Sequence, residues 1–369
     1  MRVLIAPDKF AGTLTAVEAA GAIAQGWARC APDDELDLAP MADGGPGFVD
    51  VLHASLGGEL SLHTVTGPYG EPVPATLLTL TDAAQDTAYV EAAQACGLHL
   101  TPPDQRDPER ATSRGVGELV RAAREAGARR IVVGLGGSAT NDGGAGLLAA
   151  LGATADVPLD QGPAALAGIT RFELPVARTD VDWTDVELVA ASDVDSPLLG
   201  LIGATKTFGP QKGLPEERLA AVDGWLAEYA DVVGKRLALT PGAGAAGGLG
   251  FALLALGATR VPGIELVAEA VGLPARARRA DLVVTGEGAF DFSSRSGKVP
   301  YGVAAVASAA VRPCVALAGQ VLVGSREMRA LGVESAYSLV DLVGKDAAFA
   351  DPAGSLATLA ERVARSWSP

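Results

Sequence analysis

A glycine-rich loop at residues 134–146, GLGGSATNDGGAG, carries the side chains of this chain that are best suited to chemistry. Its six glycines let the backbone approach a ligand closely, and the N–H groups of the turn and of the following helix attract anions. Ser138, Thr140, Asn141 and Asp142 add groups that hold a phosphate oxygen, an acceptor hydroxyl or a divalent metal. The loop predicts a phosphate-binding site, with a structural turn between strand and helix as the alternative.

Other acids and cations stand in glycine-rich loops or directly after apolar runs. Phosphoryl transfer needs donors around the phosphates, a divalent metal held by carboxylates, and a group that orients the attacking hydroxyl. The candidate metal or base residues are Asp8, Asp43, Asp142, Asp193, Glu287 and Asp291. The candidate phosphate partners are Lys9, Arg114, Lys206, Lys212 and Lys298. Each lysine taken singly is equally well read as a solvated surface charge.

Familiar nucleotide motifs are missing or poorly placed. Lys298 follows Gly297, but a valine stands where a Walker A loop needs a hydroxyl residue, so a P-loop enzyme is excluded. A literal G-x-G-x-x-G occurs at Gly242, Gly244 and Gly247, although a proline precedes it and no strand-like run leads into it. That run suits close approach to a nucleotide or to a neighbouring loop.

The elements that must position these groups alternate between helix-like and strand-like patterns, which is typical of α/β units around a largely parallel sheet. The apolar strand runs are residues 2–7, 87–91, 129–134, 186–192, 281–286 and 313–319. Ligands gather at the carboxyl ends of such strands. We therefore expect Asp8, the 134–146 loop, Asp193 and Glu287 to share one site.

Helices and boundaries can also be placed. Thr15 and Glu18 form a capping box that opens a helix over residues 15–29. Further apolar stripes follow Ser113 and Pro215. Residues 237–259 contain no charge, but glycines and a proline break their first half, so we expect a buried helix after a glycine loop rather than a membrane span. Residues 67–74 look like a linker, and a second boundary is expected near residues 272–280.

Composition narrows the function further. A chain of 369 residues is long enough for two domains, and a net charge of -15 argues against a general basic surface for nucleic acid. The three cysteines and three histidines lack disulfide or metal-ligand spacing. The N-terminal apolar run is too short for a secretory signal, so we expect a cytoplasmic protein.

At this point the motifs resemble those of the bacterial glycerate kinases of the type-1 family. Eight matches occur in order along nearly the whole chain. They are APDKF with TLTA at residues 6–16, PMADGG at 40–45, TSRGVGEL at 112–119, GGSATNDGGAG at 136–146, SDV with PL at 192–198, FGPQKG at 208–213, PGAGAAGGLG at 241–250, and TGEGAFD with GKVP at 285–300.

The resemblance implies an α/β fold with two lobes and the active site in the cleft between them. A Rossmann-like parallel-sheet lobe would comprise residues 1–66 and 281–369, and a second α/β lobe, residues 67–280, would be inserted into it. The implied reaction is ATP- and Mg²⁺-dependent phosphorylation of D-glycerate, most simply at the 2-hydroxyl. The 3-hydroxyl and a related hydroxy acid stay open as alternatives, as does a homodimer.

Several positions depart from the family pattern inside the motifs. In place of an acid and a hydroxyl residue, this chain has Pro46 and Phe48. It has Ala11 in place of a lysine, Ser196 in place of an asparagine, and Ser293 and Ser294 in place of a Gln-Thr pair. The glycine scaffold is intact. Kinase chemistry is therefore better supported than the identity of the acceptor.

We assign roles on this basis. Asp193, with Asp8 second, orients the acceptor hydroxyl, and Arg114 or Lys9 binds the carboxylate of glycerate. Nucleotide binding is assigned to Gly136, Gly137, Ser138, Thr140, Asn141, Lys212, Gly244, Gly247 and Lys298. Asp43, Arg114 and Lys206 are assigned to substrate binding, and Asp142, Glu287 and Asp291 to the metal. Two rivals remain: a dehydrogenase using the G-x-G-x-x-G run, and a two-lobed protein that binds a small acid without turnover.

Overall fold

The computed structural model describes residues 1–81, 86–174, 185–291 and 298–368, and in it the chain divides into two compact units. Unit 1 comprises Met1–Asp43, Asp50–Gly57 and Gly263–Pro369, and unit 2 comprises Gly44–Val49 and Gly58–Pro262. Both chain ends therefore belong to unit 1. The family-type α/β architecture, with one parallel-sheet lobe and a second α/β lobe, is confirmed.

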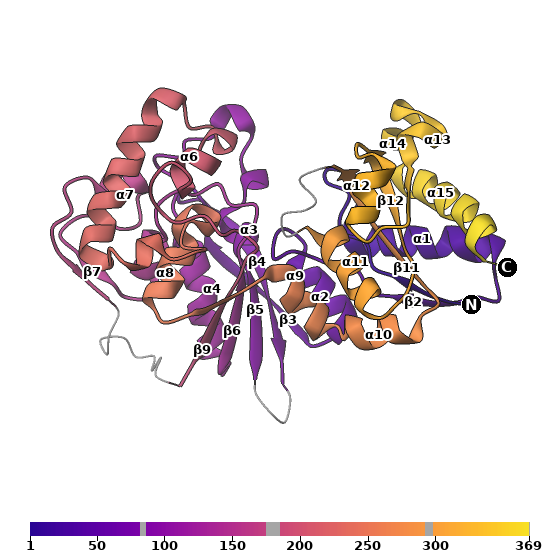
Figure 1. The fold of residues 1–369 in the computed structure, drawn as a ribbon. Coiled ribbons are helices and arrows are strands. Elements are labelled where there is room, and N and C mark those ends of the chain that lie inside the picture. The colour runs from indigo at the N-terminus through magenta and orange to yellow at the C-terminus, as the bar shows by residue number, and fades with distance from the viewer. Residues whose placement is uncertain (82–85, 175–184, 292–297, 369) are drawn as a thin grey trace. The chain divides into compact units, whose positions relative to one another are not determined.

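Unit 1 is built on a five-stranded, fully parallel sheet in the order β13-β12-β11-β1-β2 (Figure 1). Its strands are β1 (Arg2–Ile5), β2 (Glu35–Leu38), β11 (Leu282–Phe290), β12 (Cys314–Val321) and β13 (Ser335–Ser338). Its helices are α1 (Ala16–Cys30), α2 (Phe48–Leu56), α9 (Gly263–Ala270), α10 (Leu273–Arg279), α11 (Val299–Ala309), α12 (Ser325–Ala330), α13 (Leu339–Val343), α14 (Lys345–Ala350) and α15 (Pro352–Trp367).

The strand order of unit 1 reverses between β1 and β11. Counted along this unit the order is 2-1-3-4-5, the arrangement of a doubly wound sheet with a switch point beside its first strand. Helices α1 and α15 pack together on one face, where Trp27 and Ile23 are fully buried. The chain leaves β1 and β11 on opposite sides, so the loops after them diverge and leave a crevice for a ligand.

Helix α1 shows how local sequence builds this unit. Thr15 accepts a hydrogen bond from the Glu18 N–H, and the Glu18 carboxylate accepts one from the Thr15 N–H, which completes the expected capping box. The helix begins at Ala16 and ends at Cys30, within one residue of the expected range. The loop that precedes it, which carries Asp8, is thereby held between a strand and a capped helix.

Unit 2 is built on a six-stranded mixed sheet in the order β10-β9-β6-β5-β4-β3. Strands β5, β6, β9 and β10 are parallel, whereas β3 and β4 are antiparallel. The strands are β3 (Glu59–Thr66), β4 (Pro72–Leu80), β5 (Thr87–Glu91), β6 (Arg130–Gly134), β9 (Glu187–Ala191) and β10 (Thr259–Val261), with a small separate pair β7 (Thr154–Ala155) and β8 (Phe172–Glu173). The helices are α3 (Ala92–Cys96), α4 (Arg114–Glu125), α5 (Ala145–Ala150), α6 (Ala204–Phe208), α7 (Leu219–Val233) and α8 (Leu249–Ala255).

The observed boundaries differ from the expected ones. Residues 67–74 are not a linker between domains: the Gly67 N–H donates to the Glu71 carbonyl at 2.6 Å, which closes the turn that joins β3 to β4. Strand β3 therefore belongs to unit 2 rather than to the first lobe. The later boundary lies at residues 262–263, because α9 and α10 pack against α11 of unit 1.

The uncharged stretch at residues 237–259 contains α8, whose residues 249–253 are all buried. The expectation of a buried helix after a glycine loop is confirmed. None of the helices within the four described ranges is both long and apolar enough to cross a membrane.

Candidate active site

The sequence-predicted residues fall into two groups, one in each unit. In unit 1, the ends of β1 and β2 lead into Asp8 and Asp43, while Glu287 lies within β11. The strand expected over residues 281–286 therefore continues through Glu287 to Phe290. Backbone pairing continues past the strand ends: the Asp8 N–H donates to the Gly286 carbonyl at 2.8 Å, and the Met41 N–H donates to the Pro7 carbonyl at 2.9 Å. The three carboxylates are therefore held by the backbone at the switch point of the sheet.

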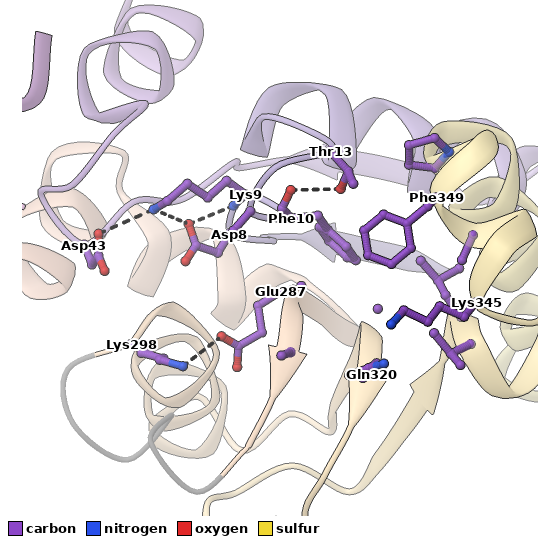
Figure 2. Close-up of a pocket in the computed structure, with 18 residues that line it drawn as sticks. Asp8, Lys9, Phe10, Thr13, Asp43, Glu287, Lys298, Gln320, Lys345 and Phe349 are labelled. Atoms are coloured by element: carbon purple, nitrogen blue, oxygen red, sulfur yellow. Dashed lines mark hydrogen bonds and ion pairs between the residues drawn. The ribbon is translucent and has the colours of Figure 1, made fainter. Parts of the chain in front are cut away.

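Two lysines lie among these acids (Figure 2). Lys9 Nζ is 3.5 Å from Asp8 Oδ1 and 3.8 Å from Asp43 Oδ1. Lys298 Nζ is 3.7 Å from Glu287 Oε2 and 3.6 Å from Asp291 Oδ1. These separations exceed those of close hydrogen bonds, so each ammonium can turn from a carboxylate toward a phosphate oxygen without breaking a short hydrogen bond to that carboxylate.

Asp8 is one of the buried carboxylates of this group. Its side chain is almost completely buried, and this burial, opposed by Lys9 and reinforced by the Asp43 charge, raises its pKa from 3.8 to about 6. Its Oδ1 accepts a hydrogen bond of 2.7 Å from the Lys9 N–H. A buried carboxylate with a pKa near neutrality, beside a lysine, is typical of a functional site.

A pocket of about 520 Å³ opens over these residues, entirely within unit 1. One end is charged and carries Asp8, Lys9, Asp43, Glu287 and Lys298. The lining also includes Phe10, Leu339, Val340, Ala348, Phe349 and Pro352, which we call the apolar end. Figure 2 shows the labelled Phe10 and Phe349 on the side of the pocket away from Asp43. A pocket of this volume accommodates a ligand of nucleotide size.

The charged end fits a hard divalent cation that arrives with a phosphate ligand. Mg²⁺ prefers oxygen donors and is commonly held by one or two carboxylates together with waters and substrate phosphates. Within the described ranges, no three His, Cys, Asp or Glu side chains are grouped so as to hold a metal ion by themselves. The carboxylates of Glu287 and Asp291 are oxygen donors of the kind that a metal shared with a phosphate takes.

In unit 2, Asp142 occupies a different environment from the one expected of a metal ligand. Its carboxylate is fully buried and accepts four hydrogen bonds, from the N–H and hydroxyl of Ser113 and the N–H groups of Gly144 and Gly146, at 2.7–3.2 Å. Burial raises its pKa, and the hydrogen bonds oppose that shift. These donors engage both oxygens, so Asp142 fixes the glycine loop to the start of α4. Its assignment to the metal stays a prediction.

Lys212 links the same loop to the 208–213 segment. Its ammonium is buried and donates to Ser138 Oγ at 3.1 Å and to the Thr140 carbonyl at 2.5 Å. Burial lowers its pKa from 10.5 to about 8. The next loop residue, Asn141, donates from its side-chain amide to Thr205 Oγ1 at 2.9 Å, while its buried Oδ1 has no hydrogen-bond partner among the residues that the structure describes. A buried, unpaired polar atom in a loop of this kind calls for a ligand or a water.

Glu91 is a site residue that the motif-based reasoning missed. It ends β5, is buried, and accepts hydrogen bonds from the N–H groups of Gly47 at 3.1 Å and Val49 at 3.3 Å. These hydrogen bonds attach the segment Gly44–Val49 to the carboxyl end of β5 in the unit 2 sheet. A carboxylate at the end of a buried strand was visible in TAYVE and follows the rule already applied to Asp8.

The segment Gly44–Val49 also explains the first glycines of the loop. A Cβ added at Gly136 would lie 2.5 Å from the Gly45 Cα, and one at Gly137 would lie 2.8 Å from Pro46 Cγ. Phe48 is fully buried and makes an edge-to-face contact with Tyr89. The residues at positions 46 and 48 thus pack within unit 2. Gly136 and Gly137 are explained by backbone packing, and their nucleotide contact stays a prediction.

The G-x-G-x-x-G run likewise has a packing explanation. Gly247 has a φ of +69°, and a Cβ there would lie 1.9 Å from the Thr140 carbonyl oxygen. A Cβ at Gly244 would lie 2.2 Å from the Pro197 carbonyl oxygen. A 3₁₀ turn at Leu237–Leu239, not a strand, leads into the run. The close approach is therefore to neighbouring loops, which removes the structural basis of the dehydrogenase alternative.

Two further predicted cations of unit 2, Arg114 and Lys206, form ion pairs with acidic side chains. Arg114 pairs with Glu118 at 3.1 Å and with Asp160 at 2.6 Å, and Lys206 pairs with Asp223 at 3.3 Å. These ion pairs already compete for the two cations, so their assignment to the substrate stays a prediction without further support.

Asp193 follows the end of β9 and is half-buried. The Leu135 N–H, at the start of the 134–146 loop, donates to the Ala191 carbonyl at 2.9 Å, so Asp193 and this loop leave the sheet from the same edge. Ser293, Ser294 and Gly297 lie outside the described residues.

Comparisons with known proteins extend these observations. The sequence model of the glycerate kinase family matches residues 3–368. A glycerate kinase of Bacillus subtilis is 42% identical over 92% of this chain and 90% of its own length. A glycerate 2-kinase of Escherichia coli is 41% identical over 93% of this chain and 92% of its own length. A crystal structure described as glycerate kinase 2 of Salmonella typhimurium superposes with a TM-score of 0.82 at 38% identity, covering 99% of this chain and 98% of that one.

Proposed function

Because this chain belongs to the glycerate kinase family, we propose that it transfers the γ-phosphoryl group of ATP to the 2-hydroxyl of D-glycerate, giving 2-phosphoglycerate and ADP. The observation that carries the proposal is the group of acids and lysines at the switch point of unit 1, beside a nucleotide-sized pocket. The name of the Escherichia coli relative favours the 2-hydroxyl over the 3-hydroxyl.

Lys9 and Lys298 are assigned to the phosphate groups of the donor. Each ammonium already lies near two carboxylates, so it can exchange one of them for a phosphate oxygen without moving far. Glu287 and Asp291 would hold Mg²⁺, which neutralises the charge of the phosphates when it is bound. Charge stabilisation and positioning are the main demands of phosphoryl transfer.

Asp193 is assigned to the acceptor, with Asp8 as the second choice. The acceptor oxygen forms a bond to the γ-phosphorus while the bond from that phosphorus to the bridging oxygen of ADP breaks. The carboxylate accepts the proton that the hydroxyl loses. The carboxylate of glycerate is assigned to Lys9 or Arg114, with N–H groups of the 134–146 loop as further donors.

A coupled assay of ADP release tests the proposal. Purified protein with ATP and Mg²⁺ should release ADP when D-glycerate is added, and not when it is omitted. Binding of D-glycerate in calorimetry without any ADP release would instead support the small-acid binding protein. Release that is independent of glycerate would contradict the proposed acceptor.

A further inference from the structure

The apolar end of the unit 1 pocket, defined above by Phe10, Leu339, Val340, Ala348, Phe349 and Pro352, has no role in the chemistry assigned so far. A three-carbon acid would fill only a small part of a pocket of about 520 Å³. The apolar and charged ends belong to one continuous pocket, so a ligand that occupies both must be apolar at one end and anionic at the other.

Phe349 is the most informative residue of this end. Its side chain is 60% exposed although it lines a concave pocket, whereas Phe10 opposite is 3% exposed. Both residues line the pocket, and Figure 2 shows them on its side away from Asp43. An exposed aromatic ring beside a buried one gains apolar contact when a flat ring is inserted next to it.

The backbone that presents Phe349 is well anchored. Helix α14 packs against α13 and α15, and the Ala347 carbonyl accepts hydrogen bonds from the Asp351 N–H at 3.1 Å and from Ser355 Oγ at 3.4 Å. Ala348, which precedes Phe349 in α14, is buried in the core of the unit. The ring is therefore held at the pocket by an ordered element rather than by a long loop.

Polar side chains border the apolar end. Gln320, in β12, offers an amide that both donates and accepts, and Lys345, in α14, offers an ammonium (Figure 2). A purine ring needs this combination of apolar faces and a few polar groups at its edge. A phosphate alone or a small acid does not need it.

We propose that the apolar end binds the adenine ring of the nucleotide donor, beside Phe349 and Phe10, with the phosphates directed toward Lys9 and Lys298. This inference rests on the proposed function for the identity of the donor. It moves the nucleoside from the 134–146 loop, whose glycines are explained by packing, to the switch point of the parallel sheet.

Titration of the full-length protein with ADP by calorimetry tests the inference without any turnover. Stacking of a base on an aromatic side chain contributes to affinity, so Phe349→Ala should weaken ADP binding about tenfold, or about 1.4 kcal/mol. Leu322→Ala is the matched control, since Leu322 is a 64% exposed apolar residue of the same unit that does not line the pocket. Unchanged ADP affinity in Phe349→Ala would overturn the inference.

Ligand fragments locate the two ends separately. Phe349→Ala should weaken adenosine binding and leave tripolyphosphate binding as it is, whereas Lys298→Met should do the reverse. A tryptophan introduced as Phe349→Trp should be quenched by ADP, while one introduced as Leu322→Trp should not. If Phe349→Ala instead weakens glycerate and spares adenosine, the apolar end does not bind the nucleoside.

The failure of this inference can be told apart from the failure of the proposed function. Glycerate-dependent ADP release with an unchanged KM for ATP in Phe349→Ala would preserve the kinase and reject the adenine site. Loss of ADP binding in Phe349→Ala, in a protein that never phosphorylates glycerate, would preserve the adenine site and reject the proposed acceptor.

Discussion

Replacing Asp8 by asparagine should make the protein more stable at neutral pH, because this carboxylate is buried at a cost to folding. Its pKa is raised from 3.8 to about 6, chiefly by burial, so the folded protein binds the proton more tightly than the unfolded chain does. The contribution of Asp8 to the stability of the wild type is therefore highest below pH 4 and is lost as the pH rises through 6. Asparagine carries no charge, so its burial has no such pH-dependent cost.

The size of the effect follows from the pKa shift. A shift of about two pKa units corresponds to about 3 kcal/mol of unfolding free energy. About 2 kcal/mol of this difference should develop between pH 4.5 and pH 7.5, the range in which Asp8 ionises in the folded state. The part below pH 4.5 reflects ionisation of the unfolded chain.

Urea unfolding at a series of pH values measures the prediction. Circular dichroism and tryptophan fluorescence follow the unfolding transition. The free energy of unfolding of Asp8→Asn minus that of the wild type should increase from acid to neutral pH. Asp50→Asn, at an exposed position of α2 in the same unit, controls for the loss of a surface carboxylate. A difference that stays constant with pH, or that decreases toward pH 7.5, would refute the assigned cause of the Asp8 shift.

Substitutions at three further positions test the roles assigned in unit 2. Asp193→Asn should lower kcat by orders of magnitude while the melting temperature stays close to that of the wild type, and near-normal turnover would reject its role at the acceptor hydroxyl. Asp142→Ala should reduce the unfolding free energy by about 3 kcal/mol, since three buried N–H groups lose their acceptor; in the milder Asp142→Asn, an altered Mg²⁺ concentration for half-maximal activity would show that it is a metal ligand after all. The unfolding free energy of Lys212→Met minus that of the wild type should be largest below pH 8, where the buried ammonium is charged. This difference should decrease as the pH rises through the lowered pKa of Lys212. A difference independent of pH would contradict the burial of a charged ammonium.

Much of the fold could be predicted because its signals are local. The six apolar runs form β1, β5, β6, β9, β11 and β12, since each is short, β-branched and buried on both faces. The capping box of α1 lies within four residues of sequence. Gly127 ends α4 with a φ of +96°, as a glycine after a helix commonly does.

The missed elements depend on pairing between segments rather than on local pattern. Strands β3 and β4 form an antiparallel hairpin at the edge of the unit 2 sheet, and the Gly and Pro residues of their turn resemble a linker when read alone. Leu60 and Leu62 of β3 are exposed, so the strand lacks the buried apolar run that identified the others. Its membership of unit 2 becomes clear only from its partner strand.

The candidate site shows the same division. Asp8 could be predicted because it follows a buried strand of a parallel sheet. Glu287 could be predicted because it follows the apolar run at residues 281–286, although β11 continues past it to Phe290. From the sequence alone, Asp142 could not be distinguished from an exposed metal ligand. Ser113, whose N–H and hydroxyl both donate to the Asp142 carboxylate, lies 29 residues away in sequence. The packing of Gly247 against Thr140 is also invisible in the sequence, where a glycine for a ligand and a glycine for a neighbouring loop look alike.

Phosphorus NMR of the reaction mixture tests the central claim most directly. With ATP, Mg²⁺ and D-glycerate, we predict the growth of ADP signals together with one new phosphomonoester signal, split into a doublet by the single proton on C2 of 2-phosphoglycerate. A triplet, from the two protons on C3, would contradict the assigned hydroxyl. A spectrum that stays that of ATP alone would contradict the kinase.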